Sequence, residues 1–132
     1  MRASIERILL DTHTLVWAID APEILSEPAR QAIGKGPVYL SVVSLWELIL
    51  KRKNESALLA DPVDWWNRHV SADAMTVLPV TAAHIVYLER LPEIHRDPFD
   101  RILLCQAAIE GLTLITRDTD IGLYTDAAIV RA

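Results

Sequence analysis

The chain has 132 residues, of which 52% are hydrophobic, and a formal net charge of −5. This length and composition predict one globular domain over residues 1–132 and exclude a disordered chain. The negative charge argues against a basic protein that coats nucleic acid, but not against a nuclease whose acids are neutralised by metal ions.

The first predicted element is a strand over residues 8–10, where three aliphatic residues run into Asp11. A short apolar run that ends at polar residues is typical of a strand buried on both faces of a parallel sheet. A helix is predicted over residues 27–33, because Gly34-Lys35-Gly36-Pro37 forms a stop signal. These glycines lack the spacing and the Lys-Ser/Thr ending of a phosphate-binding loop.

Residues 38–43 predict the second strand, and a helix follows from Ser44 to about Lys53. Ser44 and Glu47 fit a Ser-x-x-Glu capping box at the start of this helix. Glu47 can also pair with Lys51, because residues four apart lie on the same face of a helix.

The second half of the chain continues to alternate helices with strands. Asp97-Pro98-Phe99-Asp100 opens the clearest helix, since an N-cap acid, a proline at the first helical position and an acid in the first turn are strong start signals. The predicted elements are helices over residues 61–69, 81–91, 97–110 and 119–124, and strands over residues 76–80, 112–115 and 127–130. This alternation predicts an α/β protein, a three-layer α/β/α fold with a mostly parallel five-stranded sheet.

Four acids follow predicted strands or begin predicted helices: Asp11, Glu47, Asp100 and Asp118. Taken singly, each has an interpretation as a helix cap or as a partner of the helix dipole. In a parallel sheet, however, the carboxyl ends of the strands meet at one edge, where Asp11 and Asp118 would lie together and the other two acids can reach them. Converging carboxylates repel one another unless protons or cations intervene, and such oxygen ligands suit Mg²⁺ or Mn²⁺.

Other kinds of site have weaker support. The histidines include no His-x-x-x-His pair with zinc-binding spacing, and the chain has no Gly-x-Ser-x-Gly elbow. His95 is interpreted as a loop residue that could approach a phosphate at the sheet edge. Cys105, the single cysteine, lies in an apolar run, which favours a buried core thiol over a nucleophile.

The sequence also predicts a cytoplasmic protein without a membrane partner. No stretch reaches the roughly 18 apolar residues that span a membrane. The apolar run before Asp11 is too short for a secretory signal. One cysteine excludes an internal disulfide and fits a reducing compartment.

Four motifs resemble, in order, those of PIN-domain proteins, and most closely those of the VapC-type toxins of bacterial toxin–antitoxin modules. They lie at residues 9–13, 44–47, 95–101 and 114–118, so the resemblance covers nearly the whole chain. It implies that an acidic quartet holds Mg²⁺ or Mn²⁺: Asp11, Glu47, Asp100 and Asp118.

The same resemblance implies roles for neighbouring residues. Three hydroxyl side chains match positions near such sites: Thr12, Ser44 and Thr116. Asp97 is assigned to capping and Asp100 to the metal, although their closeness allows a swap. Asp120 is a further candidate beside Asp118, and residues 120–122 depart from the aromatic often found there.

The function implied by the resemblance is endoribonucleolytic cleavage of RNA, commonly a structured RNA such as a transfer RNA, by metal-activated water. It also implies a cognate antitoxin and a homodimer. Arg101 is a candidate for phosphate contact or for structural pairing within the site. Trp65 and Trp66 are interpreted as core or dimer contacts, or as part of an apolar groove for the antitoxin. Other cations near the acids could meet RNA phosphates or form an ordinary solvated surface: Lys51, Arg52, Lys53, Arg96 and Arg117.

Two alternative functions stay open at this point. One is an aspartate-nucleophile phosphatase or phosphotransferase with Asp11 as the nucleophile, although such enzymes usually have a second acid where this chain has His13. The other is a non-catalytic PIN-like binding module, in which the acids serve only as caps.

Overall fold

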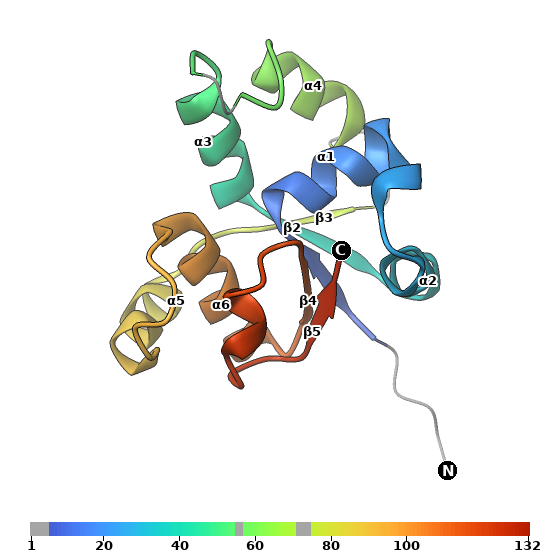
Figure 1. Cartoon of the computed structure of the whole chain (residues 1–132). Coiled ribbons are helices and arrows are strands. Elements are labelled where there is room, and N and C mark those ends of the chain that lie inside the picture. Colours follow the sequence, from blue (N-terminus) through green and yellow to red (C-terminus); the bar gives the residue numbers. More distant parts are fainter. Residues whose placement is uncertain (1–5, 55–56, 71–74) are drawn as a thin grey trace.

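The computed structural model describes residues 6–54, 57–70 and 75–132, which contain a five-stranded sheet in the order β3-β2-β1-β4-β5 (Figure 1). All four strand pairings are parallel. The strands are β1 (Ile8–Leu10), β2 (Val38–Ser41), β3 (Thr76–Leu78), β4 (Thr113–Thr116) and β5 (Ile129–Arg131). The predicted α/β class and strand number are therefore confirmed.

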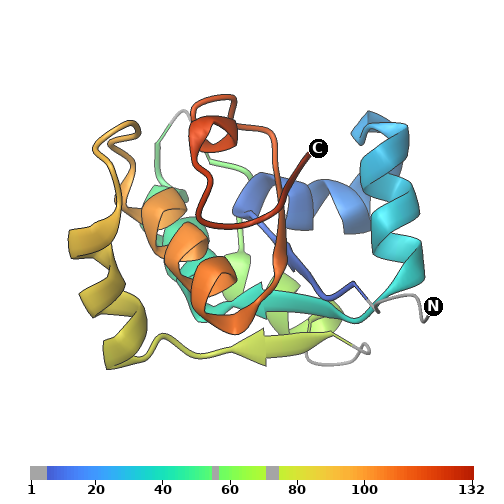
Figure 2. The same ribbon diagram turned by 90° about the horizontal axis from the view of Figure 1, so that it is seen from below.

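Helices cover both faces of this sheet. In Figure 1, α1, α3 and α4 lie on one face, and α5 and α6 lie on the other. Figure 2 shows α5 and α6 side by side. The α-helices are α1 (Thr12–Asp20), α2 (Glu27–Lys35), α3 (Val42–Lys51), α4 (Pro62–His69), α5 (Ala82–Tyr87) and α6 (Pro98–Glu110). Short 3-10 turns are η1 (Pro22–Ile24), η2 (Leu88–Arg90) and η3 (Ile121–Leu123).

The central strand β1 explains why the first apolar run is uninterrupted. Ile8 and Leu10 point into the core formed with α1, α2, α3 and α4, whereas Leu9 points into the core formed with α6. All three side chains are fully buried. Because alternate residues of a strand face opposite sides, a strand covered on both faces needs apolar residues throughout.

The predicted start of α3 is wrong by three residues. The strand ends at Ser41, whose hydroxyl accepts a hydrogen bond from the Val43 N–H and caps the helix, so Ser44 lies buried inside α3 and forms no capping box. The strand cannot continue because its neighbours end level with it: Leu10 is opposite Leu40, and Leu78 is opposite Ser41.

Other local predictions agree with the structure. Asp61, Thr81 and Asp97 are the N-caps of α4, α5 and α6, and Gly111 ends α6 with a φ of 68°. The helix predicted over residues 81–91 divides into α5 and η2, and the one over residues 119–124 shortens to η3.

Three apolar predictions concern the core. Cys105 is fully buried, as predicted, and Trp65 and Trp66 belong to the core around α4. Dimer and groove contacts for the two tryptophans are thereby disfavoured. Within the described part of the chain, no helix is both long and apolar enough to cross a membrane.

The predicted end of α2 at residue 33 is wrong by two residues, because Gly34 lies inside the helix and Gly36 is its C-cap, and these two glycines provide a test of backbone packing. A methyl group at Gly36 would collide with the backbone carbonyl oxygen of Glu6, whereas one at Gly34 would meet no atom. We expect Gly36→Ala to lower the free energy of unfolding by about 1–3 kcal/mol. Gly34→Ala, inside the helix, should raise it by roughly 0.5–1 kcal/mol. Urea unfolding measures both, and equal stability of the two variants would contradict the close approach.

Candidate functional site

The four predicted acids line one hollow at the carboxyl ends of β1 and β4. We call it the acidic hollow, and its volume is about 100 Å³. Its lining also includes Asp97 and four side chains that are cationic or hydrogen-bonding: Thr12, His13, Lys51 and Arg117. Segments far apart in the sequence therefore meet where the sheet topology predicts.

Asp11 forms the floor of the acidic hollow, where it connects three elements. Its side chain is 4% exposed and caps α1, since Oδ1 accepts a hydrogen bond from the Thr14 N–H at 2.8 Å. Oδ2 accepts from the Arg117 N–H at 3.2 Å, and the Asp11 N–H donates to the Ile115 carbonyl at 3.0 Å. Capping and facing the hollow are thus compatible for this residue.

Glu47 enters the hollow from the middle of α3. Its side chain is buried, and Oε1 accepts a hydrogen bond from the Thr12 hydroxyl at 2.6 Å. The Thr12 hydroxyl also lies 3.1 Å from that of Ser44, so both predicted hydroxyl positions support Glu47. On the other side, Oε2 forms the predicted ion pair with the Lys51 ammonium at 2.7 Å.

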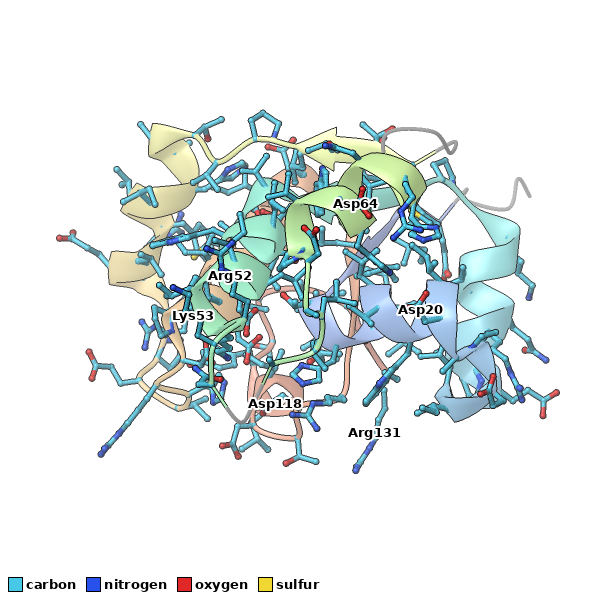
Figure 3. The ribbon with its side chains drawn as sticks, turned by 90° about the horizontal axis from the view of Figure 1, so that it is seen from above. Asp20, Arg52, Lys53, Asp64, Asp118 and Arg131 are labelled. Atoms are coloured by element: carbon cyan, nitrogen blue, oxygen red, sulfur yellow. The ribbon has the colours of Figure 1, made fainter. Side chains whose placement is uncertain are left out.

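Lys51 is a cation held inside the acidic lining. Partial burial lowers the pKa of this ammonium, but the hydrogen bond to Glu47 and the charges of Asp97 and Asp100 outweigh that effect and raise it. The side chain therefore carries its full positive charge at neutral pH. Arg52 and Lys53 follow it at the end of α3, and Figure 3 labels both together with Asp118.

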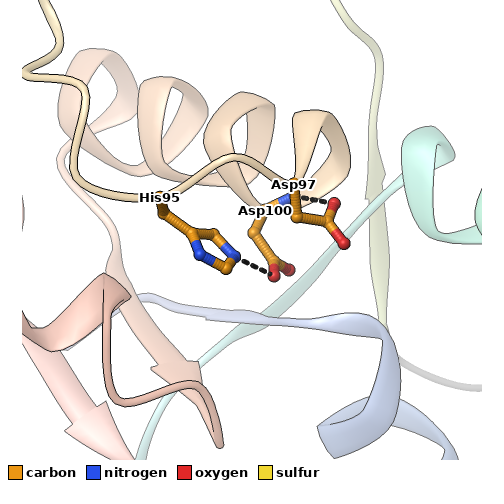
Figure 4. Close-up of side chains that lie close together, drawn as sticks. All are labelled: His95, Asp97 and Asp100. Atoms are coloured by element: carbon orange, nitrogen blue, oxygen red, sulfur yellow. Dashed lines mark hydrogen bonds and ion pairs between the residues drawn. The ribbon is translucent and has the colours of Figure 1, made fainter.

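The amino end of α6 supplies two acids with different tasks (Figure 4). Asp97 caps the helix, because its Oδ1 accepts from the Phe99 N–H at 2.8 Å and the Asp100 N–H at 3.2 Å. Asp100 instead pairs with His95, whose Nε2 lies 2.9 Å from Oδ2. Asp97 is the cap, as predicted, and both carboxylates line the hollow.

The loop after β4 brings Asp118 to the hollow. The Asp118 N–H donates to the Thr116 hydroxyl at 3.0 Å, so this third predicted hydroxyl fixes the backbone of the loop. Oδ1 of Asp118 accepts from the Asp120 N–H at 2.8 Å, and Oδ2 lies 3.4 Å from His95 Nε2. Asp120 is 58% exposed, and its Oδ2 lies 3.7 Å from His95 Nδ1.

His95 is the residue whose importance the sequence analysis missed. Its ring nitrogens lie among the carboxylates of Asp97, Asp100, Asp118 and Asp120, close enough to form two groups of possible metal ligands. Burial lowers the pKa of this imidazole, but the hydrogen bond to Asp100 and the neighbouring acidic charges outweigh it and raise the pKa. The sequence does contain a partial indication of this position. Asp100 lies in the first turn of α6, and a side chain there is close to residues that precede the N-cap, such as His95.

The loop that carries His95 is held by side chains from two elements. The Tyr124 hydroxyl accepts hydrogen bonds from the Ile94 and His95 N–H groups and donates to the Pro92 carbonyl. Arg101 donates to the His95 carbonyl at 3.2 Å. This bond supports the structural pairing suggested for Arg101.

The electrostatics of the hollow favour cation binding. Burial raises the pKa of Asp100 to about 7, and the charges of Asp97, Asp11 and Glu47 add to this rise, while the hydrogen bond from His95 opposes it. Acids that repel one another in this way gain from a divalent cation. Carboxylate oxygens are the preferred ligands of Mg²⁺, and an added imidazole nitrogen is compatible with Mn²⁺. The donor set therefore fits a divalent cation.

Comparisons with known proteins agree with this geometry. The family model of the PIN domain matches residues 8–126. Over 114 residues the chain is 32% identical to Ribonuclease VapC22 of Mycobacterium tuberculosis, an alignment that covers 84% of this chain and 86% of that protein.

Solved structures share the fold at low sequence identity. VapBC2 from Rickettsia felis, bound to a DNA fragment from its promoter, has a TM-score of 0.70 at 14% identity, over 96% of this chain and 98% of that one. FitAcB from Neisseria gonorrhoeae has a TM-score of 0.65 at 19% identity, over 92% and 95% of the two chains.

The raised pKa of Asp100 predicts a pH-dependent stability in the presence of a chelator. Because the pKa is about 7 in the folded protein against an ordinary 3.8, ionisation of Asp100 removes stability as the pH rises through this window. We expect the stability advantage of Asp100→Asn over the wild type to grow from the ordinary pKa of 3.8 to about pH 7 and to stay constant above it, at ~1 kcal/mol or more.

Urea unfolding at several pH values, with a chelator throughout, measures this difference. Asp64→Asn is the matched control, because Asp64 is an exposed acid of α4 that pairs with Arg68 away from the acidic hollow. A difference between Asp100→Asn and the wild type that stays constant with pH would contradict the electrostatic account.

Proposed function

The chain belongs to the PIN-domain family, and from this premise we propose that it is a metal-dependent endoribonuclease acting as the toxin of a toxin–antitoxin module. Its 32% identical relative is named a ribonuclease, and its fold neighbours include proteins of toxin–antitoxin complexes. A PIN-like fold alone does not determine which reaction a protein catalyses, so the assignment depends on the residues of the site.

The observation that carries the proposal is the convergence of four carboxylates from four separate segments on the acidic hollow. Helix capping requires an acid at each helix start, but it does not require the acids to meet. Asp11 and Glu47 are each 4% exposed, and their partners within the protein, backbone N–H groups for the first and Lys51 for the second, do not require the four acids to meet. A cation-binding role accounts for their placement, whereas capping does not.

We assign metal binding to Asp11, Glu47, Asp100 and Asp118, with Mg²⁺ or Mn²⁺ as the ion. When bound, such an ion supplies charge neutralisation at a phosphodiester and a lowered pKa for attacking water. Thr12 and Ser44 orient Glu47, Thr116 fixes the loop of Asp118, and Arg101 holds the backbone of His95.

The proposal includes partners and a location. The substrate is RNA, the protein resides in the cytoplasm, and its toxic activity is restrained by a cognate antitoxin. A homodimer has support in the exposed apolar side chains of neighbouring helices, with Trp46 and Leu50 of α3 each 59% exposed and Ile85 of α5 48% exposed.

The geometry disfavours the phosphotransferase alternative. Both carboxylate oxygens of Asp11 already accept backbone hydrogen bonds, from Thr14 and from Arg117. These bonds stabilise the anion and reduce its strength as a nucleophile. His13 stands where such enzymes usually have a second acid.

Replacing Asp11 by Asn tests the metal site without removing the cap, because asparagine also caps helices well. We expect Asp11→Asn to fold normally and to lower Mn²⁺-dependent RNA cleavage by roughly 100-fold or more. The increase in melting temperature that Mn²⁺ produces should also be smaller in Asp11→Asn than in the wild type.

Asp61→Asn makes the same change at the N-cap of α4, outside the acidic hollow. This control variant should retain both Mn²⁺-dependent RNA cleavage and the increase in melting temperature with Mn²⁺. Full cleavage by Asp11→Asn would refute the site. A wild type that shows neither cleavage nor a metal-linked gain in melting temperature would favour the non-catalytic module.

Lys51 gives a second test, because its ammonium partly neutralises Glu47 when no metal is bound. In chelator, Lys51→Met should lose about 1–2 kcal/mol of stability, since a buried carboxylate loses its partner. Mn²⁺ should then raise its melting temperature more than it raises that of the wild type. Lys35→Met, at the exposed end of α2, is the control. An unchanged metal response in Lys51→Met would contradict competition between this ammonium and the metal.

A further inference from the structure

A second and larger hollow, of about 600 Å³, has His95 in its wall. We call it the arginine hollow, because Arg96 and Arg101 line it together with His95. The His95 ring hydrogen-bonds to Asp100, which lines the acidic hollow (Figure 4). A molecule that fills the arginine hollow therefore lies next to the proposed metal site.

The sign of the charge changes between the two hollows. Five carboxylates line the acidic hollow, against the cations Lys51 and Arg117. In the arginine hollow the two guanidinium groups face a single acid, Glu93. A polyanion with one phosphate at a bound cation would place the adjacent phosphate where fixed positive charge is available. Consecutive phosphates of a nucleic acid strand have this arrangement.

The arginine hollow also offers surfaces for a base. Leu88, Pro98 and Ile102 form apolar parts of its wall, and guanidinium planes stack on bases. Its volume falls in the usual range for pockets that hold small molecules. A single unstacked nucleotide fits this description, whereas a base-paired duplex cannot enter a hollow of that size.

The wall of the hollow is held in place before any ligand binds. Arg101 is fixed to the His95 carbonyl, and the Tyr124 hydroxyl holds the backbone of Ile94 and His95. Arg96, by contrast, is exposed on this fixed loop. A cation on an ordered loop loses less conformational freedom on contacting a phosphate than one on a free segment.

We propose that the arginine hollow binds the nucleotide adjacent to the scissile phosphate of a single-stranded RNA segment. Arg96 contacts the neighbouring phosphate, and the base packs between Ile102 and the Arg101 guanidinium. The inference rests on the proposed function and extends it, because it assigns a substrate-binding role to residues outside the acidic hollow.

The test compares Arg96→Ala with Arg90→Ala on two substrates. Arg90 is an exposed arginine of η2 whose guanidinium lies over Tyr87, and it does not line the hollow. With Mn²⁺ and a single-stranded RNA, Arg96→Ala should raise KM about tenfold while kcat stays near the wild-type value. The dependence of log KM on log salt concentration should weaken by about 0.7, the value for one lost phosphate contact on a single strand.

The second substrate is bis(4-nitrophenyl) phosphate, a small phosphodiester without a neighbouring nucleotide. Arg96→Ala should hydrolyse it as the wild type does, because the proposed contact is absent. Ile102→Ala should raise KM for RNA without changing the salt dependence.

Three results would overturn the proposal. Equal KM values for Arg96→Ala and Arg90→Ala on RNA would show that Arg96 does not contact a phosphate of the substrate. The proposed function would still stand in that case if the wild type cleaves RNA. If Arg96→Ala lost the same fraction of its activity on both substrates, Arg96 would act at the metal site and not on a neighbouring nucleotide. A wild type that cleaves neither substrate would refute the ribonuclease function itself, and this inference with it.

Discussion

Carboxylates that share a small volume repel one another, and much of the structure around the acidic hollow serves to hold them there. The sheet topology brings two of these acids together. Because β1 and β4 are parallel neighbours, the residues that follow them, Asp11 and Asp118, emerge at the same edge. The remaining acids arrive on α3 and α6. Burial, together with repulsion from the neighbouring acids, raises the pKa of Asp100.

Backbone N–H groups offset part of this repulsion. Asp11, Asp97 and Asp118 each accept hydrogen bonds from main-chain donors at the start of a helix or turn. Glu47 is held by side chains instead, the Thr12 hydroxyl and the Lys51 ammonium. Capping and cation binding are therefore two uses of the same side chains. A carboxylate has enough lone pairs to accept from the backbone and still face a hollow.

The sequence was sufficient where local chemistry decides the structure. The aliphatic run of β1, the cap at Asp97 and the left-handed glycine at Gly111 are all local signals. The start of α3 was missed because Ser41 and Ser44 are both plausible caps. Strand pairing decides between them, since β2 has no partner beyond Ser41. The place of His95 was only partly predictable, because its partner Asp100 is close in sequence whereas Asp118 and Tyr124 are distant.

The separation of charges at His95 has a physical reason. A guanidinium paired with the carboxylates would compete with a divalent cation, and the one arginine that lines the acidic hollow, Arg117, has its guanidinium carbon 5.8 Å from the centre of the Trp17 ring. Arg96 and Arg101 line the arginine hollow and not the acidic one, so they can attract a phosphate without neutralising the acids. Lys51 does pair with an acid of the hollow, and its flexible stem allows its ammonium to leave Glu47 when a divalent cation binds. Cation binding and polyanion binding thus use adjacent volumes of opposite charge, which is the arrangement that a phosphodiester spanning both of them requires.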